Sequence, residues 1–240
     1  MKELFELDGV ISRGEKFYNE LKKDNNGRYK SWEYCYSIFY KAHLNKNIDE
    51  AYLDYLSLHL AFYLASWGMY RGSSFLLQRD YKIHKKIILE LFKEKYDELW
   101  GMKLNLYKEI RIQKLLIELT DNIGRIYNEI RLRVKDNEPE NNISSTLITK
   151  VLMGTMGCVP AYDRYFISGI KYIKISTGNF NINSILKLVD FYEKYFEEFE
   201  NVRKNMKINE LEYPQMKLLD MCFWQVGFEL DEKKGLKNSH

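Results

Sequence analysis

Proline is scarce in this 240-residue chain, which contains only Pro139, Pro160 and Pro214. Proline interrupts helices and marks turns, so its scarcity favours long helices over a β protein with many turns. Hydrophobic residues make up 45% of the chain and charged residues 30%, a balance typical of globular proteins. We therefore expect an all-α protein, a single compact domain over residues 1–240 with eight to ten helices. The polar segment 135–142, KDNEPENN, is a possible sub-domain boundary or an exposed loop.

Cysteine is also rare, and Cys35, Cys158 and Cys222 are too far apart to form a CxxC pair. The histidines are isolated as well, so no spacing typical of a zinc site is present, and we expect no metal. No glycine-rich phosphate loop or GxSxG nucleophile elbow occurs, and we expect no cofactor. The start, MKELFELDG, is acidic and poor in apolar residues, which is unlike a signal peptide. The expected location is therefore cytoplasmic.

Long hydrophobic runs and a strong net charge are both missing. The longest apolar run, from Leu58 to Trp67, is interrupted by His59 and is too short to span a bilayer, so we expect no membrane partner. The net charge of +3 does not by itself indicate a nucleic-acid partner. Basic residues recur between Lys103 and Lys135, but acidic residues are interspersed among them, which favours a mixed solvated helix face.

Residues 48–66 carry apolar side chains on nearly every side of the predicted helix. Asn47 is suited to cap its first turn, in which Asp49 and Glu50 would be favoured by the positive end of the helix. A helix that is apolar nearly all round is typically central in a fold. The sequence therefore predicts that this helix lies inside the protein.

The segment 143–166, ISSTLITKVLMGTMGCVPAYDRYF, differs most from ordinary helix packing. Ser144 or Ser145 can cap a helix that carries Lys150, and Gly154 and Gly157 can end it in a sharp turn. Asp163 then falls in the first turn of the next helix. A lysine whose pKa is lowered can act as a nucleophile, and a nearby aspartate can move protons.

This segment resembles the helix-hairpin-helix DNA glycosylase superfamily or an uncharacterised bacterial relative. The resemblance rests on the pair Thr149–Lys150, and on VPAYDRYF, in which a proline leads to an aspartate at the next helix start. It implies a glycosylase-like helical fold and DNA as a possible partner. It also implies that Lys150 attacks the sugar C1′ and that Asp163 stabilises the developing cation. Whether the chain is an enzyme stays open.

Two further segments suggest alternatives. RDYKIH, from Arg79 to His84, resembles the ribonuclease motif of the all-α HEPN family, and this resemblance implies RNA cleavage by those two residues. Trp67, Tyr70 and Arg71 lie beside glycines and serines, where the aromatic rings could stack on a ligand. Each segment also has a purely structural interpretation, as a basic helix face or as a core turn. A non-enzymatic helical module for structure or protein interaction is therefore the third functional hypothesis.

Overall fold

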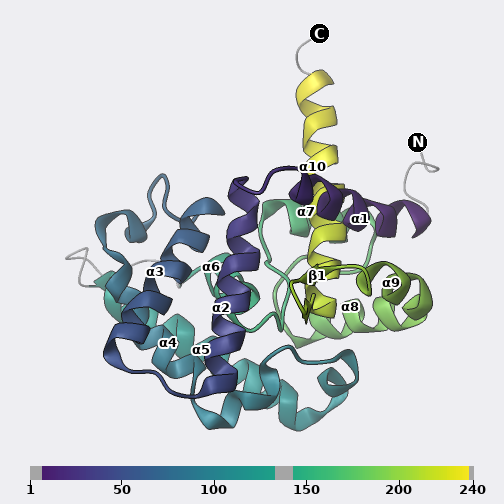
Figure 1. The fold of residues 1–240 in the computed structure, drawn as a ribbon. Helices are drawn as coiled ribbons and strands as arrows, with labels where there is room; N and C mark the ends of the chain where they lie inside the picture. Colours follow the sequence, from purple (N-terminus) through teal and green to yellow (C-terminus); the bar gives the residue numbers. More distant parts are fainter. Residues whose placement is uncertain (1–6, 133–142, 238–240) are drawn as a thin grey trace. The chain divides into compact units, whose positions relative to one another are not determined.

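The computed structural model describes residues 7–132 and 143–237, so the predicted boundary at 135–142 lies outside the described residues. The fold class is confirmed as all-α, since the described residues form ten α-helices, several short 3-10 helices and one two-stranded antiparallel hairpin (Figure 1). Contacts divide the chain into two compact units. Unit 1 comprises residues 1–25, 103–108 and 159–240, and unit 2 comprises residues 26–102 and 109–158.

Unit 2 contains five α-helices and four 3-10 helices of the described chain. They are η2 (Arg28–Lys30), α2 (Ser31–Asn45), α3 (Glu50–Ser66), η3 (Phe75–Gln78), η4 (Tyr81–His84), α4 (Lys85–Leu91), η5 (Glu94–Leu99), α5 (Ile110–Leu132) and α6 (Ser145–Thr155). Helix α3 contacts α2, α4, α6 and η4. Asp49, rather than the predicted Asn47, caps α3 by accepting a hydrogen bond from the Tyr52 amide.

Unit 1 contains the other five α-helices, one 3-10 helix and the hairpin. They are α1 (Leu7–Lys23), η6 (Leu104–Lys108), α7 (Arg164–Tyr172), α8 (Ile182–Lys194), α9 (Phe196–Arg203), β1 (Lys207–Ile208), β2 (Leu211–Glu212) and α10 (Gln215–Lys237). Lys207 pairs with Glu212 and Ile208 with Leu211 in the hairpin. Helix α10 lies against α7 and α1 (Figure 1).

Two glycines allow α7 and α10 to approach closely. A Cβ atom on Gly169 of α7 would lie 2.0 Å from the carbonyl oxygen of Phe223, and one on Gly227 of α10 would lie 1.9 Å from that of Tyr165. Carbon and oxygen atoms cannot pack at such distances. The contact between these helices therefore requires a residue without a side chain at both positions.

Candidate functional site

Lys150, the predicted nucleophile, is buried on α6 and contacts the C-terminal end of α3. Its Nζ atom donates a hydrogen bond to the carbonyl oxygen of Trp67 at 2.7 Å and lies 5.5 Å from the centre of the Trp67 indole ring. Trp67 is the C-cap residue of α3. Carbonyl oxygens at this end of a helix lack intrahelical partners, and the helix dipole favours a positive charge there. Lys150 therefore stabilises the end of α3 through both effects.

The sequence around Lys150 explains how α6 reaches α3. Ser144 caps α6 by accepting a hydrogen bond from the Leu147 amide, as the sequence predicted. A Cβ atom on Gly154 would lie 2.2 Å from the Tyr63 ring, so this glycine lets the two helices come close. Gly157 then adopts a φ of 66° and its amide bonds to the Leu152 carbonyl, which ends α6 in the left-handed turn that favours glycine.

Asp163, the predicted catalytic carboxylate, is the N-cap of α7. One of its oxygens accepts hydrogen bonds from the amides of Tyr165 and Phe166, both at 3.1 Å. These contacts satisfy amide groups that the first turn leaves without helical partners. Asp163 belongs to unit 1 and Lys150 to unit 2, and the contacts of each residue described above lie within its own unit. Their pairing in one catalytic centre stays a prediction.

His84 of the ribonuclease motif is fully buried between two tyrosines. Its Nε2 atom lies 2.8 Å from the Tyr70 hydroxyl, and its Nδ1 atom lies 2.8 Å from the Tyr127 hydroxyl. Burial lowers the pKa of His84 to about 3 and raises the pKa of Tyr70 to about 12. Near neutral pH the three groups are therefore an uncharged hydrogen-bond chain, in which one ring nitrogen donates and the other accepts.

The other predicted site residues lie on the segment that leads from α3 to η4. The Trp67 ring packs against Tyr29, with ring centres 4.8 Å apart, while Arg71 is exposed. Arg79 is half-buried and follows η3 as its C-cap residue. The structure thus brings Trp67 to Lys150 and Tyr70 to His84, two pairings that the sequence did not indicate. The proposed ligand and ribonuclease roles of these residues stay predictions.

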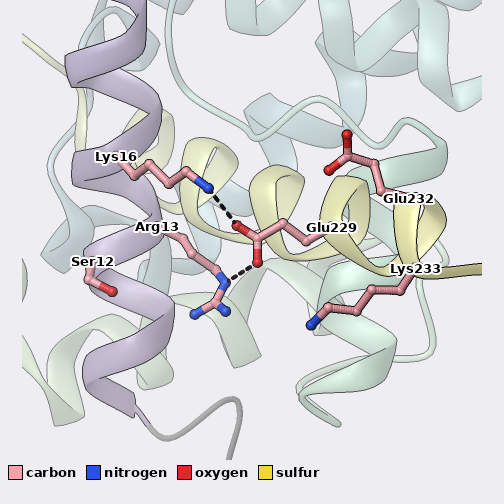
Figure 2. Close-up of a pocket in the computed structure, with 6 residues that line it drawn as sticks. All are labelled: Ser12, Arg13, Lys16, Glu229, Glu232 and Lys233. Carbon is pink, nitrogen blue, oxygen red and sulfur yellow. Dashed lines mark hydrogen bonds and ion pairs between the residues drawn. The ribbon is translucent and has the colours of Figure 1, made fainter. Parts of the chain in front are cut away.

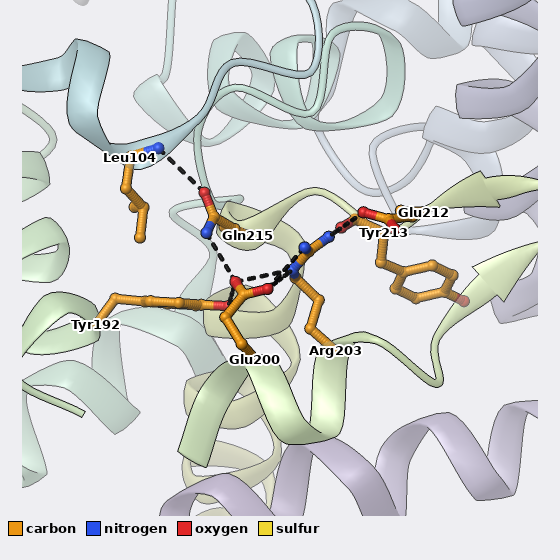
Figure 3. A network of polar contacts seen from close by, with 7 residues as sticks. All are labelled: Leu104, Tyr192, Glu200, Arg203, Glu212, Tyr213 and Gln215. Atoms are coloured by element: carbon orange, nitrogen blue, oxygen red, sulfur yellow. Dashed lines mark hydrogen bonds and ion pairs between the residues drawn. The ribbon is translucent and has the colours of Figure 1, made fainter. Parts of the chain in front are cut away.

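A polar network in unit 1 was not predicted from the sequence. It joins side chains of α8, α9, β2 and α10 with two backbone groups (Figure 3). The residues are Leu104, Tyr192, Glu200, Arg203, Glu212, Tyr213 and Gln215. Glu200 accepts hydrogen bonds from the Tyr192 hydroxyl, from Gln215 and from Arg203. Burial alone would raise the pKa of Glu200, but these donors hold it below its ordinary value. The carboxylate therefore stays ionised and ties these elements together.

A surface cavity of about 490 Å³ lies between α1 and α10 in unit 1. Its lining is formed by Ser12, Arg13, Lys16, Glu229, Glu232 and Lys233 (Figure 2). Arg13 and Lys16 both point to Glu229, with which they form ion pairs of 2.8 and 3.3 Å. The opposite charges largely cancel, so the cavity does not present a strong field of one sign.

Helix α3 exposes an apolar stripe, so the prediction that this helix lies inside the protein is wrong for that side. Ala51, Tyr55, Leu58, Phe62 and Ala65 face solvent, and we call these five residues the α3 seam. The exposed fractions of the three large side chains are 44% for Tyr55, 52% for Leu58 and 60% for Phe62. The opposite face, with Leu56, Leu60 and Leu64 among its residues, is completely buried.

The α3 seam has a spacing that helices use to pack against each other. Its residues follow one another at intervals of four, three, four and three positions, which is the spacing of the a and d positions in a coiled-coil helix. This pattern was visible in the sequence, but the apolar residues of the buried face obscured it. Only the packing of α3 against its neighbours shows which face is covered.

No cluster of three or more histidine, cysteine, aspartate or glutamate side chains that could hold a metal ion occurs among residues 7–132 and 143–237. All three cysteines are buried and free, and burial raises the pKa of each thiol. Within the same ranges, no helix has the length and hydropathy to cross a bilayer. No protein-family model, curated protein or solved structure matches this chain.

Proposed function

We propose that the protein is a non-enzymatic helical interaction module that binds a partner helix along the α3 seam. The observation that carries this proposal is the continuous apolar stripe at coiled-coil spacing on an otherwise well-packed helix. Isolated exposed apolar residues are common on proteins, but five in register on one helix form a surface suited to another helix.

The contacts of the predicted catalytic residues agree with a non-enzymatic role. Lys150 binds the end of α3, Asp163 caps α7, and His84 bridges two tyrosines. Each polar group therefore has a structural task that accounts for its burial or position. Among the described residues the α3 seam stays exposed, and fully burying a large apolar side chain contributes roughly 1.5–3 kcal/mol. A partner helix would supply that cover.

Site-specific photo-cross-linking tests the proposal. A benzophenone amino acid at position 62 should cross-link a partner in the cells from which the protein comes, and the linked residues should fall on one face of a helix. The same group at Phe196, which is 44% exposed on α9, is the matched control. The proposal is contradicted if position 62 yields no more cross-links than position 196, or if the linked residues do not lie on a helix.

A further inference from the structure

We infer that the partner helix is α3 of a second copy of this chain, packed antiparallel to the first about Leu58. This inference rests on the proposed function, because it uses the same seam. In a two-fold interface the same surface patch is used on both copies, and the axis turns one copy by half a turn. The patch must therefore be complementary to itself after that rotation. The α3 seam meets this requirement in both size and charge.

The side chains of the seam follow the same order of sizes from either end of the helix. The order is alanine, aromatic, leucine, aromatic, alanine, and Leu58 is the middle residue. In the antiparallel arrangement, Leu58 meets Leu58 of the second copy, and Tyr55 lies near Phe62 of that copy. The alanines meet at both ends, where their small side chains allow close approach. Two aromatic pairs thus flank a central leucine pair, and such pairs are favourable when the rings meet edge to face or offset.

In charge, the helix favours an antiparallel over a parallel arrangement. Its acidic residues, Glu50 and Asp54, lie near the N-terminus, and residues 55–66 contain no acidic or basic residue apart from His59. Lys85 forms ion pairs with both carboxylates, at 2.6 and 2.9 Å, so their charges are largely compensated and the helix dipole decides the direction of the pair. Antiparallel packing places the positive end of each helix dipole beside the negative end of the other.

The extent of the seam indicates a reversible dimer. The 17 residues of α3 span about 25 Å at 1.5 Å per residue, and one pair of such helices buries less surface than a standard stable interface. The monomer also tolerates the exposure of the seam's apolar side chains to solvent. We therefore expect a dimer that forms with rising concentration in the micromolar range.

Sedimentation equilibrium of the full chain tests self-association. The wild type should shift from monomer to dimer with concentration, and Phe62→Glu should raise the dissociation constant at least tenfold, because a carboxylate would be buried in an apolar contact. Phe196→Glu is the matched control, since it makes the same change at an exposed phenylalanine outside the seam. Circular dichroism and thermal unfolding should show that both variants fold as the wild type does. A wild type that remains monomeric at high micromolar concentration overturns the inference, as does a dimer that Phe62→Glu leaves intact.

Single cysteines distinguish the two directions. Leu58→Cys should form an intermolecular disulfide, because position 58 lies at the two-fold axis. Ala51→Cys should not, because the two copies of position 51 would be about 20 Å apart along an antiparallel pair. The native cysteines are fully buried and should not interfere. A disulfide at position 51 would overturn the antiparallel arrangement.

The failure of this inference can be told from the failure of the proposed function. A monomeric protein whose position 62 cross-links a helix of a different protein loses the self-pairing but retains the interaction role. A monomeric protein with no position-specific cross-link loses both.

Discussion

The ammonium group of Lys150 and the carbonyl oxygen of Trp67 lie 2.7 Å apart, although the two residues are 83 positions apart in the chain. This hydrogen bond joins α6 to the end of α3. It gives a structural account of a buried lysine that the sequence marked as a possible nucleophile. It also links the proposed interaction surface to the core, because Lys150 holds the helix that carries the α3 seam.

Replacing Lys150 with methionine should destabilise the protein by about 1–3 kcal/mol, since a helix-end carbonyl would lose its charged donor. Methionine retains most of the side-chain volume, so the loss reports mainly on the hydrogen bond and the charge. Urea unfolding followed by circular dichroism measures the change. Lys86→Met, at an exposed lysine of α4, should stay within about 0.5 kcal/mol of the wild type.

The same variant bears on the glycosylase prediction. Borohydride trapping on abasic-site DNA detects a covalent adduct of an attacking lysine, and we expect none that depends on Lys150. A trapped adduct in the wild type that disappears in Lys150→Met would favour catalysis over the interaction role.

His84 should make folding stability depend on pH. Its pKa is about 3 in the folded protein and 6.5 in an unfolded chain, so below pH 6.5 the unfolded state binds a proton that the folded state excludes. Stability should therefore fall as the pH is lowered from about 6.5 toward 3, by about 1.4 kcal/mol per pH unit from this residue. The difference between the wild type and His84→Gln isolates that slope from the titration of other groups.

Nuclear magnetic resonance gives a direct check on the same residue. The His84 ring signals should show no titration near pH 6.5 in the folded protein. A midpoint near that value, or an equal pH dependence of stability in His84→Gln, would contradict the buried neutral histidine.

Lys217 and Asp220 form a buried ion pair on α10. Replacing only one of the two residues should strongly destabilise the protein. Their charged groups are 2.8 Å apart, and Asp220 also accepts a hydrogen bond from the Ala161 amide. Burial raises the pKa of Asp220, and the neighbouring ammonium group opposes that shift. Lys217→Met should cost about 3–5 kcal/mol, because it leaves a buried carboxylate without its cation.

A double-mutant cycle tests this coupling. Lys217→Met combined with Asp220→Asn should recover much of the stability, because the amide removes the buried charge and can still accept from the Ala161 amide. Unfolding free energies of the four proteins should therefore be strongly non-additive. Additive losses would show that the two side chains contribute independently.

Gly169→Ala should destabilise unit 1 by at least about 1–3 kcal/mol, because its methyl group would overlap the backbone of α10 and force α7 and α10 apart. Gly124→Ala is the matched change, at a helical glycine of α5. A Cβ atom there would lie 3.4 Å from Ile148, an ordinary contact. It should be neutral or stabilising by up to about 1 kcal/mol, because alanine favours helix more than glycine does. Thermal unfolding distinguishes the two, and similar midpoints would contradict the close approach.

Much of the local structure followed from the sequence by itself. The few prolines predicted the all-α class, and Ser144 and Gly157 predicted how α6 begins and ends. These features depend on groups a few residues apart, so short-range rules are sufficient. Helix boundaries were less accurate, since Asp49 rather than the predicted Asn47 caps α3. Gly154, which was also expected to end α6, lies inside the helix.

The tertiary structure decided the partners of the polar groups and the exposed face of α3. Lys150 meets Trp67, and His84 meets Tyr70 and Tyr127, because the packing of α6, α3, η4 and α5 brings together distant parts of the chain. The sequence determined that α3 is apolar on two faces, but it could not show which face its neighbours cover. Burial is a property of all the packed helices together, and it left the α3 seam in solvent.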